Sequence, residues 1–397
     1  MKSIDQALLA GKKVLVRVDY NVPQNELLQV TSTTRIKRTV ETVNKITNEG
    51  GIAILMSHLG RPKGEVNDTF SLKHIVSAVC ETLENPVIYL GDVLDPEIEE
   101  KINRLTSGEV ALLENLRFHK EEEKGDLDFA KAIARLGDIY VNDAFGTAHR
   151  EHASTATIAR LFPKNAYAGY LLFGEVQSLK KTLEEKKSPF TAIIGGAKVS
   201  TKINILKNLI DKVDNLIIGG GMSYTFLSAL GFSHGNSLYE EEMVPVAKEI
   251  IEQAKLKKIN IYLPVDNLCA DIFSENANTL LTEDQNVPND WIGMDIGPKT
   301  IELFKKVILD SKTILWNGPV GVFEMDKFAG GTKIVADAIA KSTKNGAYSL
   351  IGGGDSIAAL GKFGLSKEVS YISTGGGAML EYLEGIELPG IKALEEN

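Results

Sequence analysis

The chain has 397 residues, a formal net charge of −9, 43% hydrophobic residues and 24% charged residues. This length favours two domains, each able to bury its own core, and the composition is that of a globular protein rather than a disordered one. The negative charge opposes general binding to nucleic acid or anionic membranes, so any basic site must be a local concentration of cations.

The cysteines and the first residues indicate a cytoplasmic protein. Cys80 and Cys269 form no CxxC pair, which fits a reducing compartment and gives no thiolate metal site. No run approaches the ~20 apolar residues of a membrane span, and residues 1–6 lack the apolar core of a signal peptide. We therefore expect no nucleic acid partner and no membrane partner.

Short apolar runs alternate with helical patterns along the first half of the chain, which is typical of parallel βαβ units. A helix is predicted after the first strand, because apolar residues at 36, 40, 43 and 46 fall at helical spacing and Gly50-Gly51 can cap its end. The strands predicted in this half lie at residues 14–18, 52–56, 87–90, 110–113 and 139–141.

A charge-rich helical stretch at residues 175–187 separates the two halves and is interpreted as an interdomain helix. The strands predicted beyond it lie at residues 190–194, 216–218, 259–263, 313–316, 348–351 and 371–373. The pattern predicts an α/β fold of two Rossmann-like lobes, each a mostly parallel sheet flanked by helices, joined by the interdomain helix and a hinge. The predicted domains are residues 1–170 and 171–380, and a tail at 381–397 is expected to pack back on the body.

Ligands of open α/β sheets bind beyond the carboxyl ends of the strands, so the polar residues there are the candidate site residues. In the first half, which holds every arginine of the chain, they form a basic group with two residues able to bind hydroxyls: Asp19, Asn21, Arg35, His58, Arg61, Arg117 and Arg150. Each arginine alone could form a surface ion pair, but together at matching strand ends they favour a site for a small phospho-carboxylate.

Strands of the second half run into paired or tripled glycines at 195–196, 219–221, 352–354 and 375–377. Lys198 and Lys202 follow the first of these, and we expect them on one helical face at a helix N-terminus, where they would suit a polyphosphate. Asp355 follows the third, a position suited to Mg²⁺ held together with substrate phosphates. A glycine run by itself can also serve only tight packing of strand against helix.

Several familiar motifs are absent from the chain. There is no HExxH or tight cluster of histidine and aspartate, which argues against a protein-caged zinc or iron site. The chain also lacks a Walker GxxxxGK[ST] loop, a clean GxGxxG fingerprint and a DFG motif. P-loop enzymes, nicotinamide enzymes and protein kinases are therefore disfavoured.

Seven segments, in the same order and spanning nearly the whole chain, resemble the phosphoglycerate kinase family. They are RVDYNVP at 17–23, SHLGRP at 57–62, ENLRF at 114–118, NDAFGTAHR at 142–150, GGAKVS at 195–200, WNGPVGVFE at 316–324 and TGGGA at 374–378. The resemblance implies a monomeric two-lobe enzyme of glycolysis and gluconeogenesis. Such an enzyme moves a phosphoryl group reversibly between 1,3-bisphosphoglycerate and MgADP, giving 3-phosphoglycerate and MgATP.

The resemblance also implies roles for residues at the matching positions. The seven residues of the basic group would bind the glycerate, and Asp355 would hold Mg²⁺. The migrating group would be borne by Arg35, Lys202, Gly376 and Gly377. The nucleotide would be bound by Lys198, Lys202, Gly293, Asn317, Glu324, Gly353, Gly354, Asp355 and Ser356.

Two positions depart from the family's pattern. Thr201 stands where an acidic residue is common and could alter lysine positioning or nucleotide affinity, whereas Met379 stands where a small hydroxyl residue is common and is expected to affect packing. Two alternatives stay open at this point: a catalytically inactive, two-lobe anion-binding relative, and another small-molecule kinase with a different acceptor pocket.

Overall fold

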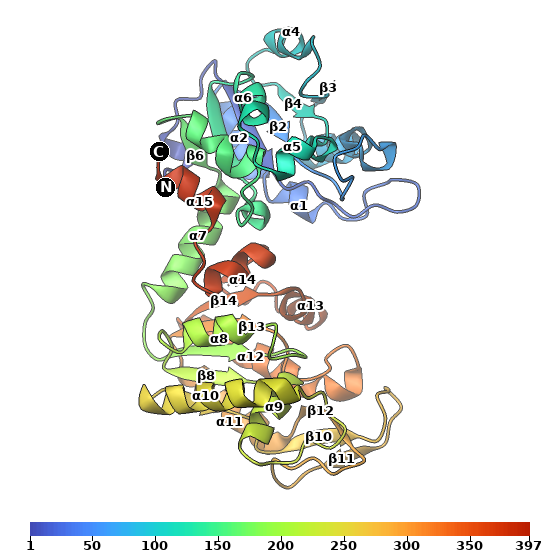
Figure 1. The fold of residues 1–397 in the computed structure, drawn as a ribbon, viewed down its shortest axis with the longest axis vertical. Helices are drawn as coiled ribbons and strands as arrows, with labels where there is room; N and C mark the ends of the chain where they lie inside the picture. The colour runs from blue at the N-terminus through green and yellow to red at the C-terminus, as the bar shows by residue number, and fades with distance from the viewer. The chain divides into compact units, whose positions relative to one another are not determined.

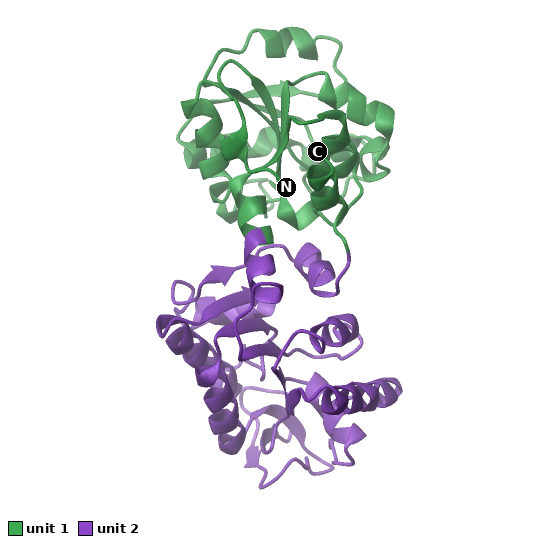
Figure 2. Ribbon diagram, turned by 90° about the vertical axis from the view of Figure 1, so that its left-hand side faces the viewer, with its two compact units in different colours: residues 1–176, 387–397 green, residues 177–386 purple.

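The computed structural model describes residues 1–397 and divides into two compact units (Figure 2). Unit 1 contains residues 1–176 and 387–397, and unit 2 contains residues 177–386. The sequence pattern put the corresponding boundaries at 170 and 381. None of the helices combines the length and the apolar character needed to cross a bilayer.

Unit 1 is built on a six-stranded parallel sheet with the order β3-β4-β2-β1-β5-β6 (Figure 1). All five predicted strands are present, and the short edge strand β6 was not predicted. The strands are β1 (Lys13–Val18), β2 (Ile52–Met56), β3 (Val87–Gly91), β4 (Val110–Leu113), β5 (Ile139–Asp143) and β6 (Ala166–Ala168). The central strands β2 and β4 are apolar along their whole length because helices cover both faces of the sheet.

The helices of unit 1 are short, and several are single turns. The α-helices are α1 (Thr34–Lys37), α2 (Val40–Asn48), α3 (Val76–Leu83), α4 (Ile98–Asn103), α5 (Lys120–Glu123), α6 (Leu127–Ala134) and α15 (Pro389–Glu395). Segment η6 (Ala153–Thr157) is a turn of π-helix. The 3₁₀ turns are Ile4–Gln6, Asp68–Phe70, Leu72–Ile75, Leu116–Phe118, Phe145–Thr147 and Ala159–Leu161.

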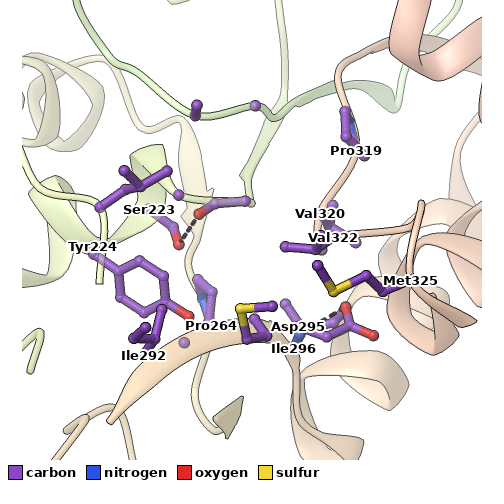
Figure 3. A pocket seen from close by; sticks show the side chains of 18 of the residues that line it. Ser223, Tyr224, Pro264, Ile292, Asp295, Ile296, Pro319, Val320, Val322 and Met325 are labelled. Atoms are coloured by element: carbon purple, nitrogen blue, oxygen red, sulfur yellow. Dashed lines mark hydrogen bonds between the residues drawn. The ribbon is translucent and has the colours of Figure 1, made fainter. Parts of the chain in front are cut away.

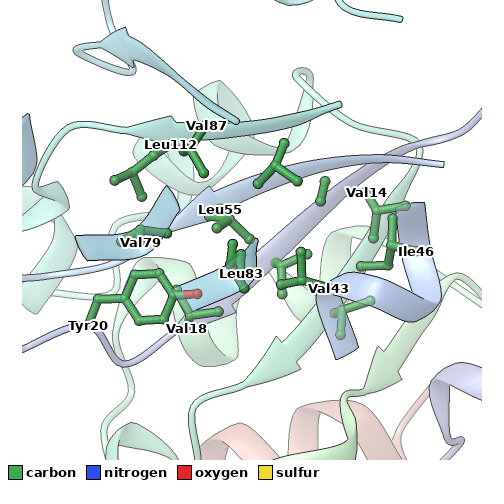
Figure 4. Packing of buried hydrophobic residues seen from close by; sticks show 14 of the residues in the cluster. Val14, Val18, Tyr20, Val43, Ile46, Leu55, Val79, Leu83, Val87 and Leu112 are labelled. Carbon is green, nitrogen blue, oxygen red and sulfur yellow. The ribbon is translucent and has the colours of Figure 1, made fainter. Parts of the chain in front are cut away.

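The core of unit 1 lies between the sheet and its helices (Figure 4). Val14 of β1, Leu55 of β2, and Val43 and Ile46 of α2 are all fully buried in one cluster. Burying such a side chain stabilises the fold by roughly 1.5–3 kcal/mol. The core therefore makes the sheet a rigid support for the loops at its carboxyl edge.

Helix α7 (Tyr170–Leu183) carries the chain from unit 1 to unit 2, and it begins and ends earlier than the predicted 175–187. Its start is determined by Asp143 at the end of β5, whose Oδ1 accepts hydrogen bonds from the backbone N–H groups of Leu171 and Leu172 at 2.9 and 3.2 Å. A carboxylate suits this position because the first N–H groups of a helix have no partner within the helix.

Unit 2 is built on a second six-stranded parallel sheet, with the order β15-β14-β13-β7-β8-β9. All six predicted strands are present. They are β7 (Phe190–Ile194), β8 (Asn215–Ile218), β9 (Asn260–Tyr262), β13 (Thr313–Asn317), β14 (Tyr348–Gly352) and β15 (Tyr371–Ile372). The helices are α8 (Ile203–Leu209), α9 (Met222–Ala229), α10 (Val244–Leu256), α11 (Pro298–Asp310), α12 (Gly330–Lys344), α13 (Gly354–Lys362) and α14 (Gly377–Leu383), with 3₁₀ turns at Glu241–Met243 and Asp326–Phe328.

A small antiparallel sheet in unit 2 was not predicted. It has the order β11-β10-β12 and contains β10 (Asn267–Ala270), β11 (Thr279–Leu281) and β12 (Ile292–Ile296). These strands contain buried polar residues such as Asn267 and Asp295, so they lack the apolar run by which the other strands were found.

The C-terminal helix α15 returns to unit 1 and packs against the segment after β5. The backbone N–H of Gly390 donates to the carbonyl oxygen of Ala148 at 2.8 Å, and Arg160 Nε lies 3.3 Å from a carboxylate oxygen of Glu396. The tail therefore supports the loop that carries Arg150 and the turn η6.

Candidate active site

The predicted basic residues of unit 1 lie at one edge of its sheet. Strands β4, β2, β1 and β5 are parallel neighbours, so their carboxyl ends meet at the same edge. The loops after them carry all the candidates except Arg35, which lies on α1: Arg117 after β4, His58 and Arg61 after β2, Asp19 and Asn21 after β1, and Arg150 after β5. Arg61 and Arg150 are exposed there.

Asp19 and Asn21 are held by contacts with neighbouring loops. The Asp19 carboxylate forms an ion pair with Arg35, whose side chain is 47% exposed and so has room to reorient. The Asn21 side-chain oxygen accepts a hydrogen bond from the backbone N–H of Gly60 at 2.9 Å. The Gly60 carbonyl oxygen in turn accepts from Arg117 Nη1 at 3.0 Å. The loops after β1, β2 and β4 are thereby linked.

His58 is a buried, neutral histidine in this group. Burial, together with the charges of Arg17, Arg117 and Arg35, holds its pKa well below the ordinary value. Its Nδ1 lies 3.1 Å from Nη2 of Arg17, and its Nε2 lies 3.9 Å from Oδ1 of Asp19.

The cations of this edge lie close enough to influence one another. Burial lowers the pKa of His152 to about 3, and the charges of Arg117, Arg17 and Arg150 act in the same direction. Burial also lowers the pKa of Arg117, which the carboxylate of Glu123, 3.2 Å from its Nε, opposes. Such an excess of positive charge favours an anionic ligand.

Arg17 belongs to this site but was not predicted as a site residue. It is fully buried within β1 and holds His58, so it does not lie among the polar residues that follow each strand. The signal that could have found it is a charged residue inside the otherwise apolar strand β1, because a cation is rarely buried without a specific partner.

In unit 2, the glycine-rich strand ends enclose a polar cavity of about 310 Å³. Lys202 Nζ donates to the side-chain oxygen of Asn317, and both residues line this cavity. Asn317 is fully buried, and its Nδ2 has no hydrogen-bond partner within the protein. A buried amide donor beside a lysine is suited to a phosphate oxygen, since an unpaired buried donor is costly.

The structure corrects the expected placement of Lys198 and Lys202 on a helix. Helix α8 begins only at Ile203, and residues 195–202 form turns that precede it. The backbone N–H and the hydroxyl of Ser200 donate to the carboxylate of Glu240 at 3.0 and 2.6 Å, which ties this segment to the residues before α10. Both lysines nevertheless line the polar cavity.

The segment after β14 brings Asp355 to the same cavity. Gly353 has a φ of +88° and packs against Asn317, where an added Cβ would lie 3.0 Å from Nδ2, so a larger residue is disfavoured. Gly354 begins α13, and the exposed Asp355 follows in its first turn. Ser356 is buried behind them and accepts a hydrogen bond from the backbone N–H of Gly318 at 2.6 Å. It supports the cavity rather than lining it.

Gly376 and Gly377 lie at the exposed N-terminus of α14, and Leu380 of that helix lines the polar cavity. Met379 is buried, and its sulfur packs against the backbone of Gly352 at the end of β14. Thr201 lines the cavity and donates to the carbonyl oxygen of Lys198 at 2.9 Å. Of the two departures from the family's pattern, only Thr201 therefore reaches the cavity.

A second cavity of about 400 Å³ adjoins the polar one and shares Gly196, Ala197 and Asp355 with it. Its walls are mostly apolar: Tyr224 and Ile292 lie on one side and Val322 and Met325 on the other (Figure 3). The unpredicted strand β12 provides one wall of it. The cavity therefore suits a flat apolar group attached to an anion.

Gly293 and Glu324, two of the predicted nucleotide residues, line this apolar cavity. The Gly293 N–H donates to Ser237 Oγ at 2.8 Å, and a Cβ at this position would overlap the Tyr224 hydroxyl. Asp295 also lines the cavity and accepts from the Gly331 N–H at 2.7 Å, while burial raises its pKa to about 7.

The side chains of the protein suit a divalent cation that needs few protein ligands. No group of three or more His, Cys, Asp or Glu side chains that could hold a metal ion occurs. Asp355 offers one exposed carboxylate that lines both cavities. A single carboxylate fits Mg²⁺, which proteins usually hold through one or two carboxylates together with substrate phosphates.

One unit carries a group of cations at its sheet edge and the other carries a polar cavity joined to an apolar one, an arrangement suited to an α/β phosphotransferase. The model of the phosphoglycerate kinase family matches residues 4–386. The chain is 48% identical to the phosphoglycerate kinase of Porphyromonas gingivalis over 99% of this chain and 100% of that protein. It is 50% identical to that of Chlorobium limicola over 100% of this chain and 99% of that protein.

Solved structures agree. The phosphoglycerate kinase of Coxiella burnetii is 42% identical with a TM-score of 0.92, covering 99% of this chain and 98% of that one. That of Pyrococcus horikoshii is 32% identical with a TM-score of 0.82, covering 100% of this chain and 98% of that one. The chain belongs to the phosphoglycerate kinase family. It is a phosphotransferase with a carboxyl group as acceptor, which transfers a phosphoryl group between 1,3-bisphosphoglycerate and ADP, giving 3-phosphoglycerate and ATP.

Proposed function

We propose that the chain catalyses this reaction by binding the glycerate at the basic edge of unit 1 and the Mg²⁺-bound nucleotide in the two adjoining cavities of unit 2. The observation that carries the proposal is the junction of the two cavities at Gly196, Ala197 and Asp355. A nucleotide that places its base in the apolar cavity and its phosphates in the polar cavity requires the two cavities to be joined.

At the basic edge, the arginines bind the phosphate and carboxylate of 3-phosphoglycerate, since guanidinium groups match both anions in a planar, two-pronged way. The Asp19 carboxylate accepts a hydrogen bond from the glycerate hydroxyl, and the amide group of Asn21 donates one to it. His58 contributes a neutral donor. Arg35, Arg61 and Arg150 are the arginines of this group that are exposed to an incoming ligand.

In unit 2, Lys198, Lys202 and the buried amide of Asn317 bind the nucleotide phosphates. Glu324 binds the ribose, and Gly293 lets the base approach the wall of the apolar cavity. Asp355 holds Mg²⁺, which would neutralise phosphate charge when bound.

The transfer step requires alignment and charge neutralisation more than a protein base. Arg35 and Lys202 supply positive charge to the migrating group, and the N-terminus of α14 at Gly376 and Gly377 supplies backbone N–H groups. The cytoplasmic location and the monomeric state stay predictions.

The proposal is tested by a coupled assay with 3-phosphoglycerate and ATP, and with 1,3-bisphosphoglycerate and ADP, each with and without Mg²⁺. We expect activity in both directions that is lost when Mg²⁺ is chelated and returns when it is restored. A folded protein without activity in either direction would refute the proposal. Activity that survives chelation would show that the reaction does not require Mg²⁺.

Replacing Asp355 with Asn should weaken the dependence of ADP binding on Mg²⁺ while the fold survives. An amide keeps the shape of the carboxylate but removes the charge that a hard cation favours. The measurement is the ADP dissociation constant by calorimetry across a Mg²⁺ titration. Asp337→Asn is the matched control, because Asp337 is a surface carboxylate of α12 paired with Lys333. Superimposable titrations for Asp355→Asn and the control would place the metal ligand elsewhere.

Binding of both substrates together should compact the protein, because the glycerate residues and the nucleotide residues belong to different units. Reacting atoms must come within roughly 3–3.5 Å of each other, and water must be excluded from the transfer. Small-angle scattering should therefore give a smaller radius of gyration with 3-phosphoglycerate and nucleotide present than with either alone. An unchanged radius in the ternary complex would argue against closure about a hinge near residues 167–175.

A further inference from the structure

A continuous chain of buried polar side chains leads from helix α5 to His58 within unit 1. Its members are Glu122 on α5, Ser154 on the π-helical turn η6, Arg17 on β1 and His58 after β2. The first three are fully buried, and His58 is 4% exposed. Buried polar groups cost free energy unless they bind one another, so such a chain indicates a specific role for its members.

The contacts along this chain are short and specific. Ser154 Oγ donates to Oε1 of Glu122 at 2.6 Å, and the Ser154 backbone N–H donates to Oε2 at 3.0 Å. Nε of Arg17 donates to Ser154 Oγ at 2.8 Å, and Nη2 of Arg17 lies 3.1 Å from Nδ1 of His58. Nη1 of Arg17 donates to the carbonyl oxygen of Val18.

The direction of each hydrogen bond follows from the chemistry of the groups. A hydroxyl has one hydrogen, so Ser154 can donate to the Glu122 carboxylate while its lone pairs accept from Arg17. A guanidinium can only donate, so Nδ1 of His58 must accept. A neutral imidazole with an accepting Nδ1 carries its proton on Nε2. The chain therefore determines one tautomer of His58.

Ser154 is itself held in place by its surroundings. The hydroxyl of Tyr140 on β5 donates to the carbonyl oxygens of Ser154 and Thr155 at 2.9 and 3.0 Å. In the π-helical turn, the Ser154 side chain lies between the carboxylate of Glu122 and the guanidinium of Arg17. Such turns are rare and occur frequently at functional sites.

We propose that Glu122 and Ser154 are positioning residues for the glycerate site: through Arg17 they hold His58 as the neutral tautomer with its proton on Nε2, directed toward Asp19 and the incoming ligand. The identity of the ligand rests on the proposed function, whereas the assignment of the tautomer does not. Glu122 also compensates the buried charge of Arg17, which is costly to leave unpaired.

The tautomer matters because the ligand is an anion. With the proton on Nε2, His58 offers a donor at the edge of the sheet that carries Asp19, 3.9 Å from Nε2. The other tautomer would turn a lone pair toward the phospho-carboxylate, and that repulsion would weaken binding. The depressed pKa of His58, caused mainly by burial, keeps the ring neutral, so the position of its one proton decides what it offers.

The test is nitrogen NMR of protein labelled with ¹⁵N-histidine, which reports directly which ring nitrogen carries the proton. The chain has six histidines, and His58→Gln identifies the relevant signals. We expect the wild type to show only the Nε2-protonated form, and Ser154→Ala, which keeps both buried charges, to show a mixture. A wild-type signal from the Nδ1-protonated form would overturn the inference without any variant.

Kinetics provide the second readout. Ser154→Ala should raise KM for 3-phosphoglycerate about tenfold, the size expected for loss of a hydrogen bond to a charged group, with KM for ATP unchanged because the nucleotide residues lie in unit 2. Glu122→Gln should act in the same direction, and Glu121→Gln is the matched control, an exposed carboxylate on the same helix. Variants that lower thermal stability but keep the wild-type tautomer and KM would reduce both residues to structural supports.

The two proposals fail in different ways. If Ser154→Ala changes the tautomer of His58 but the affinity for 3-phosphoglycerate is unchanged, the assignment of His58 to the glycerate site is wrong and the positioning chain stands. If the affinity falls while the tautomer is unchanged, the glycerate site stands and the positioning chain is wrong.

Discussion

Replacing Arg35 with Lys should lower kcat by about a thousandfold or more, because an arginine that neutralises a migrating phosphoryl group contributes an effect of this size. Lysine keeps the charge but loses the planar fork that binds two oxygens at once. Arg35 is suited to the role, since it is half-exposed and its only ion pair is with Asp19, within the site itself. The loss should therefore appear in kcat far more than in KM for 3-phosphoglycerate.

Steady-state kinetics in both directions measure this effect, and Arg135→Lys is the matched control. Arg135 is also a half-exposed arginine, with its Nε 3.0 Å from Glu99, but it lies on the surface after α6. The control should leave kcat and KM unchanged. An Arg35→Lys enzyme with normal kcat and a raised KM would make Arg35 a contact of the bound substrate rather than of the transition state.

Replacing Lys202 with Met should lower kcat by at least about a hundredfold, in the range found when one donor to a developing negative charge is removed. Methionine keeps much of the length of lysine but removes the ammonium group beside Asn317. Burial lowers the pKa of Lys202, and the carboxylates of Asp355 and Glu384 oppose this effect. ADP binding should weaken less than turnover, because Lys198 also lines the cavity.

Single-turnover kinetics separate the two effects, and Lys207→Met, in the helix α8 that follows Lys202, is the control. Lys207 is a half-exposed surface residue whose Nζ lies 3.7 Å from Glu249. If Lys202→Met binds ADP much more weakly yet transfers the phosphoryl group at the normal rate, Lys202 serves nucleotide binding alone. Equal effects of the two substitutions would exclude any role of Lys202 in the site.

The polar residues at the sheet edge of unit 1 could be predicted because their positions follow from local sequence. Strands buried on both faces must be apolar, so each strand end is visible as the point where an apolar run meets polar residues. Asp19, His58 and Arg117 were found in this way, and parallel strands then bring them to one edge. That these residues bind the glycerate stays a prediction.

The two cavities of unit 2 were only partly predictable. The glycine segments were visible in the sequence, but the Lys198–Lys202 segment was expected to be helical and forms turns instead, in which the backbone of Ser200 binds Glu240. Strand β12, which forms one wall of the apolar cavity, has buried polar residues such as Asp295 and no apolar run. These features depend on partners far away in the sequence.

By itself, the sequence determined the two parallel sheets, the order of the polar strand ends and the resemblance to one family, since each depends on runs of neighbouring residues. Only the tertiary structure decided that the tail packs on unit 1, that the two cavities join at Asp355, and that Arg17 connects His58 to Ser154. Arg17 and Ser154 are 137 positions apart, and Arg17 and His58 are 41 apart. Contacts at such separations arise from the packing of a whole unit, which no local periodicity encodes.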